Sequence, residues 1–124
     1  MSMTELSSRE YHARRDQERR AEAEALRLEV LERARTAIRQ RAPELPAIRA
    51  AYLFGSILQP GRFHAESDVD VAIDCDDLKS ETPFWRVLET ALERNVDLRP
   101  REGPSARAVE DYGKLVYERE VPDS

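Results

Sequence analysis

The stretch Tyr52–Ile73 constrains the fold most, because two apolar runs enclose a Gly-Ser pair and two carboxylates. The first run ends in Gly55 and Ser56, and the second begins at Asp68 and Asp70. Successive side chains of a strand point to opposite faces, so the two aspartates share one face and the apolar residues between and after them share the other. The pattern predicts two strands joined by a turn-rich loop, the second of which packs with one face and binds with the other.

The spacing of the two aspartates indicates a metal site. Two carboxylates this close repel each other, and one pKa must rise unless a cation or a proton lies between them. Mg²⁺ prefers oxygen ligands and is commonly held by one or two carboxylates together with substrate phosphates. Gly55 permits a sharp turn and a close backbone approach to a ligand, and the amides that follow can donate to phosphate oxygens. These features together indicate a nucleoside triphosphate bound through a metal ion.

The pattern Gly-Ser, eleven intervening residues and Asp-x-Asp resembles the signature of the DNA polymerase β-like nucleotidyltransferase superfamily. The phrase Tyr52–Ser56 is similar to the minimal nucleotidyltransferase (MNT) branch of that superfamily, and Tyr112–Glu118 is similar to its closing segment. In that family a third carboxylate lies on a later, neighbouring strand, and Asp97, an isolated acid between apolar neighbours, fits that place. The resemblance covers about residues 48–119.

The resemblance implies in-line transfer of AMP from ATP, with two Mg²⁺ ions as cofactors. Asp68, Asp70 and Asp97 are the expected catalytic and metal-binding residues, and Asp97 has the further option of acting as general base toward an incoming hydroxyl. Gly55 and Ser56 are expected to bind the nucleotide at the β- and γ-phosphates of the leaving pyrophosphate. The expected product is an AMP ester on an acceptor.

The acceptor is expected to belong to a partner. MNT proteins are commonly paired with a small helical HEPN protein, an RNA-cleaving toxin, so the resemblance implies an antitoxin that AMPylates a tyrosine hydroxyl of that toxin. One alternative is an antitoxin that acts by binding only, which the loop Leu58–Arg62 favours because many MNT proteins carry Ala-x-Gly there. Another is transfer to a small hydroxylated molecule, which needs a larger acceptor-binding domain than this chain of 124 residues offers.

Length and charge exclude several other classes of protein. A chain of this length has room for one domain. The sequence pI of about 5.2 argues against direct nucleic-acid binding, which is usually accompanied by a strongly basic surface. No apolar stretch is long enough for a membrane span, and the single cysteine, Cys75, is compatible with a reducing compartment, so we expect a cytoplasmic protein.

The first forty-odd residues predict a long charged helix, because residues 5–41 contain neither proline nor glycine and are rich in strong helix formers. We divide the chain into this helix, residues 1–42, and an MNT domain, residues 43–124. Leu28, Leu31 and Ile38 predict an apolar stripe in its second half that packs on the sheet. A short coiled coil is the rival interpretation of this second half. The first half has no such stripe. The helix as a whole is interpreted as a docking or oligomerisation element, with a solvated helix as the alternative.

The remaining sequence predicts an α+β fold, a small mixed β-sheet with helices packed on one side. Thr82 with Pro83 predicts a helix start, and Gly113 predicts a left-handed end to the last helix. Three further acids near the end of the second strand are interpreted as solvated turn carboxylates rather than metal ligands: Asp74, Asp76 and Asp77.

Overall fold

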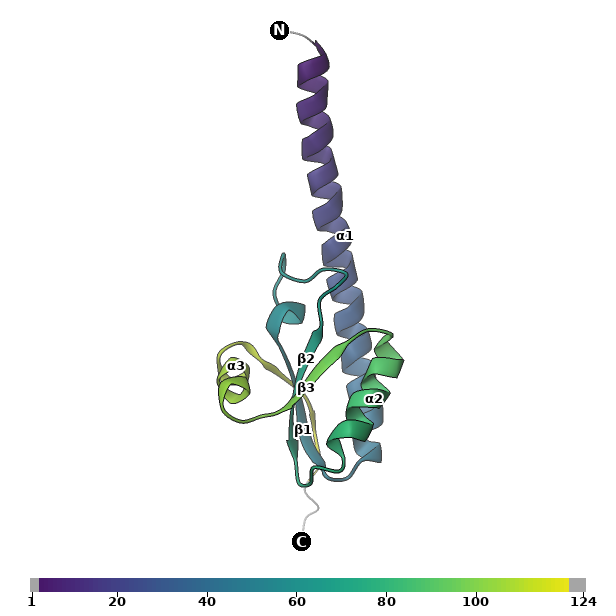
Figure 1. Ribbon diagram of the computed structural model, residues 1–124, viewed down its shortest axis with the longest axis vertical. Coiled ribbons are helices and arrows are strands. Elements are labelled where there is room, and N and C mark those ends of the chain that lie inside the picture. Colours follow the sequence, from purple (N-terminus) through teal and green to yellow (C-terminus); the bar gives the residue numbers. More distant parts are fainter. Residues whose placement is uncertain (1–2, 121–124) are drawn as a thin grey trace.

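The computed structural model describes residues 3–120, with side chains described from residue 8 onward (Figure 1). Helices and strands follow in the order α1 (Met3–Arg41), η1 (Ala42–Glu44), β1 (Ile48–Phe54), η2 (Gly55–Leu58), β2 (Val69–Cys75), α2 (Glu81–Leu92), β3 (Val96–Pro100), α3 (Pro104–Tyr112) and β4 (Lys114–Glu118). Residues 1–2 of the expected N-terminal helix and residues 121–124 of the expected MNT domain lie outside the described residues.

The four strands form one mixed sheet in the order β3-β2-β1-β4. β1 pairs antiparallel with both β2 and β4, whereas β2 and β3 are parallel and are connected through α2. A parallel pair needs such a crossover, because a short hairpin can join only antiparallel strands. The expected α+β fold with a small mixed sheet is confirmed.

One face of the sheet carries the hydrophobic core. Val69, Val71 and Ile73 of β2 are almost completely buried, as the alternation of side chains along a strand requires. α1 and α2 pack together over this face, and Phe84 and Leu88 of α2 are fully buried there. α3 lies on the other side of the strands in Figure 1, where it contacts β1 and β2. The aspartates of β2 point to this second face, which they share with α3, whereas α1 and α2 pack on the core face.

α1 divides into an exposed half and a packed half. Side chains from residue 8 to residue 22 are all exposed, and this part of the helix extends beyond the sheet (Figure 1). Val30, Ala34 and Ile38 are buried against the core. The expected place of Leu28 in the stripe is wrong, because Leu28 is 52% exposed and Arg27 occupies the buried position instead. Each helical residue turns by about 100°, so these two neighbours face different directions.

The predicted helix ends need two corrections. α2 begins at Glu81 after Ser80, so Thr82 is not the cap, and Pro83 falls within the first turn, where a missing amide costs nothing. Gly113 has φ −85°, outside the left-handed region. It lies so close to the Val109 backbone that an added Cβ would overlap it, so the close approach is what requires glycine there.

Within residues 3–120, no helix combines the length and the apolar character that crossing a membrane requires.

Candidate active site

The turn at Gly55 brings the end of β1 against the first acid of β2. η2 begins at Gly55, whose φ of +77° is a conformation that side chains rarely adopt. A Cβ at this position would overlap the carboxylate of Asp70. The next residue, Ser56, is half-buried, and Ile57 is fully buried in the core. The buried Ile57 side chain thus anchors the Gly-Ser turn to the core, and Gly55 places the turn against Asp70.

Asp70 and Asp97 lie side by side on the parallel strands β2 and β3, where the register pairs them directly. Asp68 stands one residue before β2 and is exposed. Burial, together with repulsion from Asp97 and Asp68, raises the pKa of Asp70 to about 6. The structure therefore brings the three sequence-predicted acids to one corner of the sheet, next to the Gly-Ser turn.

Arg99 supplies part of the missing positive charge. Its Nε donates to Asp97 Oδ1 at 3.0 Å, and its charge partly offsets the rise in the pKa of Asp70. The Arg99 side chain is 61% exposed. An ion pair this exposed is held weakly, because solvent screens the attraction and the long side chain loses entropy when it is fixed.

The acids fit a divalent cation by their chemistry, although they do not form a ready-made cage. Within residues 8–120, no three His, Cys, Asp or Glu side chains converge closely enough to hold a metal ion as they stand. Asp97 is turned to Arg99, and Asp68 lies outside the strand. However, three carboxylates whose repulsion raises the pKa of Asp70 are the kind of oxygen donor set that Mg²⁺ neutralises.

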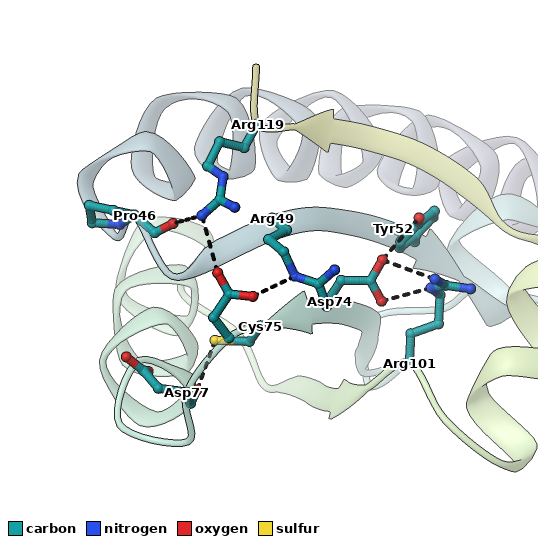
Figure 2. A network of polar contacts seen from close by, with 9 residues as sticks. Pro46, Arg49, Tyr52, Asp74, Cys75, Asp77, Arg101 and Arg119 are labelled. Atoms are coloured by element: carbon teal, nitrogen blue, oxygen red, sulfur yellow. Dashed lines mark hydrogen bonds and ion pairs between the residues drawn. The ribbon is translucent and has the colours of Figure 1, made fainter. Parts of the chain in front are cut away.

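The three acids at and after the end of β2 have partners within the protein, and Figure 2 shows those of Asp74. Asp74 accepts two hydrogen bonds from Arg101, at 2.8 and 3.0 Å, and Asp76 pairs with Arg49 at 2.7 Å. Asp77 accepts the Ser80 amide hydrogen bond at 2.9 Å. Asp76 and Asp77 are exposed, as expected of turn carboxylates, whereas Asp74 is largely buried and paired, so the expectation of a solvated acid is wrong for Asp74 alone. Their partners leave Asp74 and Asp76 neutralised without a metal.

Arg94 was not singled out by sequence reasoning, yet it shapes the loop that leads to Asp68. Its Nη2 donates to the carbonyl oxygens of His64, Ala65 and Ser67, at 3.3, 2.7 and 2.9 Å. Its guanidinium also lies 4.7 Å from the centre of the buried Phe63 ring. The loop before Asp68 and the Arg94 side chain together border a polar hollow, which is lined by Ala65, Glu66, Ser67, Asp68, Arg94 and Asn95. No local pattern marks Arg94, because its acceptors are backbone carbonyls that every residue has.

A family model described as polymerase beta, nucleotidyltransferase matches residues 36–121. This range includes the Gly-Ser turn and all three acids of the corner, and it excludes most of α1. No curated protein matches the chain.

Solved structures to which the chain is similar include chains of toxin–antitoxin complexes. A chain of a toxin–antitoxin crystal structure with AMP-PNP is 26% identical with a TM-score of 0.54, over 73% of this chain and 74% of that one. A chain of a mutant MntA-HpeT toxin–antitoxin complex is 27% identical with a TM-score of 0.50, over 64% and 68% of the two chains. A third, from a tri-AMPylated Shewanella oneidensis HEPN toxin in complex with MNT antitoxin, is 26% identical with a TM-score of 0.43, over 63% of each chain.

Proposed function

The chain belongs to the polymerase beta nucleotidyltransferase family, and from this premise we propose that it is an antitoxin that transfers AMP from ATP to a tyrosine hydroxyl of a partner HEPN toxin. The observation that carries the proposal is the corner where Asp70 and Asp97 lie side by side against Gly55. The AMP-PNP and toxin–antitoxin structures to which the chain is similar support the choice of nucleotide and of partner class.

The three acids have the role of holding Mg²⁺ in this proposal. Asp68, Asp70 and Asp97 would be its ligands, and the ion would supply charge neutralisation for the triphosphate and orient it for attack. Asp70 contributes most to metal affinity, because its carboxylate is the one that burial and repulsion disfavour without a cation. Arg99 is exposed and loosely held, so it can leave Asp97 when a stronger cation binds.

The Gly-Ser turn has the role of binding phosphate. The first amides of a helical turn have no partner within that turn and are suited to anionic oxygens. Gly55 lets this backbone come close to the acids, so the turn that would bind phosphate adjoins the carboxylates that would hold the cation. Ser56, half-buried beside it, offers a hydroxyl as a further donor.

The transfer needs one proton acceptor. The acceptor hydroxyl oxygen forms a bond to the α-phosphorus while the bond to pyrophosphate breaks, and the hydroxyl proton goes to a base. Asp97 is assigned this role, because it lies beside Asp70 and its carboxylate can accept a proton once the exposed Arg99 has moved away. The tyrosine of the partner ends as an AMP ester, and pyrophosphate leaves from the Gly-Ser turn, whose amides would hold part of its charge.

The experiment that tests the proposal is incubation with labelled ATP and Mg²⁺, with and without a co-purified helical partner. Label should appear on the partner with the wild-type protein and should be lost with the double variant Asp68→Ala/Asp70→Ala. Asp111→Ala, an exposed acid on α3, is the matched control and should leave transfer unchanged. Transfer that survives the double variant would contradict the proposed site.

A second candidate function is an antitoxin that neutralises its partner by binding alone. The observation that favours it is that Asp97 is already paired with Arg99 and that no three acids converge within residues 8–120. In that case the double variant would still bind and silence the partner, and no label would move with either protein.

A further inference from the structure

Arg27 is the only charged side chain that is buried among the described residues, with 7% of its surface exposed. It lies on the packed half of α1, ahead of residues 36–121, which match the family model. A buried charge is costly unless its donors are satisfied, so a position that could hold another leucine of the core stripe has to gain something from arginine.

The contacts of Arg27 run in two directions. Nε and Nη2 donate to the carboxylate of Glu24, one turn earlier on the helix, at 2.9 and 2.6 Å. Nη1 donates to the carbonyl oxygen of Ile57 at 3.0 Å, and this hydrogen bond is buried. Glu24 raises the pKa of Arg27, so the guanidinium stays charged despite its burial. The helix thereby delivers a fixed cationic donor to the inside of the Gly-Ser turn.

The acceptor is the residue that follows the Gly-Ser pair. The side chain of Ile57 is completely buried in the core, and the Ser56 carbonyl accepts the Gln59 amide at 2.9 Å. The Ile57 carbonyl is thus a second point, besides the Ile57 side chain, at which the protein interior holds this turn. A charged donor makes a stronger hydrogen bond to a carbonyl than a neutral one does.

We propose that Arg27 is a positioning residue for phosphate binding: through the Ile57 carbonyl it sets the orientation of the Gly55-Ser56 turn. The Ile57 carbonyl shares its peptide plane with the Leu58 amide, so holding this carbonyl fixes the last peptide plane of η2 and, through it, the short turn that begins at Gly55. The inference rests on the proposed function, since it takes this turn to be the phosphate site. It adds that a residue of α1, outside the segment that matches the family, belongs to the nucleotide site.

α1 offers a matched control for the test. Arg33, on the same helix, also donates to a backbone carbonyl, that of Ala91 at the end of α2, at 2.9 Å. Removing either donor deletes one hydrogen bond between α1 and the rest of the protein, and for Arg33 also a 4.0 Å ion pair with Glu93, but only the Arg27 contact reaches the turn. A purely structural role predicts similar behaviour for the two variants in nucleotide binding once both are folded.

The experiment compares Arg27→Met and Arg33→Met by titration calorimetry with AMP-PNP and Mg²⁺. Loss of one charge-assisted hydrogen bond predicts about tenfold weaker binding for Arg27→Met, and less than about twofold change for Arg33→Met. Arg27→Lys keeps one donor without the fork that holds Glu24, and should fall between wild type and Arg27→Met. Urea unfolding of each variant establishes that the protein is folded at the titration temperature.

A second measurement tests how firmly the turn is held when no nucleotide is present. Hydrogen exchange of the amides from residue 56 to residue 59 should accelerate in Arg27→Met and stay unchanged in Arg33→Met. Equal nucleotide affinity in the two methionine variants overturns the inference, even if exchange differs. Wild-type protein that binds AMP-PNP but transfers no AMP would end the proposed function and leave this inference standing, because binding alone tests it.

Discussion

Asp70 and Asp74 lie on the same strand and face the same side of the sheet, yet their surroundings are opposite. Asp70 is half-buried against Gly55, has two further acids nearby, and carries a raised pKa of about 6. Asp74 is held by two hydrogen bonds from Arg101 and one from the Tyr52 hydroxyl (Figure 2). The residue type is the same in both places. The partners that neighbouring residues supply therefore decide whether an aspartate is left to bind a cation or is paired within the protein.

Asp70 and Asp74 therefore affect the free energy of unfolding in opposite ways. At Asp70 the folded protein keeps a carboxylate in surroundings that disfavour its charge, which costs stability and is recovered when a cation binds. At Asp74 the charge is already balanced within the protein, so the acid contributes to stability and has little to offer a ligand. Substituting each acid by its amide should therefore have opposite consequences.

Of the substitutions considered, Asp70→Asn is expected to have the largest effect, a loss of AMP-transfer activity. Loss of a direct metal ligand should lower AMP transfer by on the order of a thousandfold, more than the roughly 10- to 100-fold typical of residues that only orient ligands. Unfolding in urea should show no loss of stability, because the variant removes repulsion from Asp68 and Asp97. Label transfer and urea midpoints measured on the same preparation check both statements. A variant that is inactive because it is unfolded would break the comparison.

Asp74→Asn is expected to show the reverse behaviour. The asparagine leaves Arg101, whose side chain is 33% exposed, without a charged partner, and should lower the free energy of unfolding by about 2 kcal/mol. Transfer of AMP at a temperature where the protein is folded should change by less than about twofold. Arg101→Met is the matched variant: the double variant should lose little more than either single one. Additive losses would show that the pair does not act as a unit.

The sequence alone located the acidic corner because its signals are local. Alternation places Asp68 and Asp70 on one face of a strand, and the isolated acid Asp97 between apolar residues marks a neighbouring strand. The register that pairs Asp70 with Asp97 agrees with the predicted grouping. The mixed sheet and the long first helix were predictable for the same reason, since each depends on the pattern within one segment.

The partners of these acids were beyond local reasoning. Asp74 and Arg101 are 27 residues apart, and Arg27 and Ile57 are 30 apart, so no helical or strand period connects them. Arginines that bind backbone carbonyls leave even less trace, because the acceptor residue can be of any type. Leu28 was misplaced for a related reason: apolar spacing alone cannot show that a buried arginine is worth more than a leucine at the next position.

Asp70 also predicts how stability depends on pH in the absence of divalent metal. Its folded pKa of about 6 lies above the ordinary value of 3.8, so between these values the folded state binds more protons than the unfolded state. Stability should therefore fall as pH rises from about 4 to about 6. After allowance for solvent screening of this half-buried group, the loss is on the order of 1 kcal/mol.

Urea midpoints across this pH range, in the presence of EDTA, measure the effect of Asp70. Asp70→Asn should flatten the profile by that amount, because the amide does not titrate. A profile that is identical in the variant would show that Asp70 ionises normally, and the contrast between the two ends of β2 would lose its electrostatic basis.

The smallest expected effect comes from Tyr52→Phe, which removes one bond at the structural end. The Tyr52 hydroxyl lies 3.3 Å from Asp74 Oδ2, a long hydrogen bond, and Arg101 already supplies two shorter ones. The phenylalanine keeps the ring over which Arg101 lies at 5.1 Å, so the free energy of unfolding should fall by only about 0.5 kcal/mol. Tyr52→Leu also loses the cation–ring contact and should cost about 0.5 to 1 kcal/mol more.

Since burial raises the pKa of Tyr52, its hydroxyl stays neutral at pH 7 and adds no charge to the balance at Asp74. A loss in Tyr52→Phe as large as that in Asp74→Asn would mean that the tyrosine, and not Arg101, satisfies this acid.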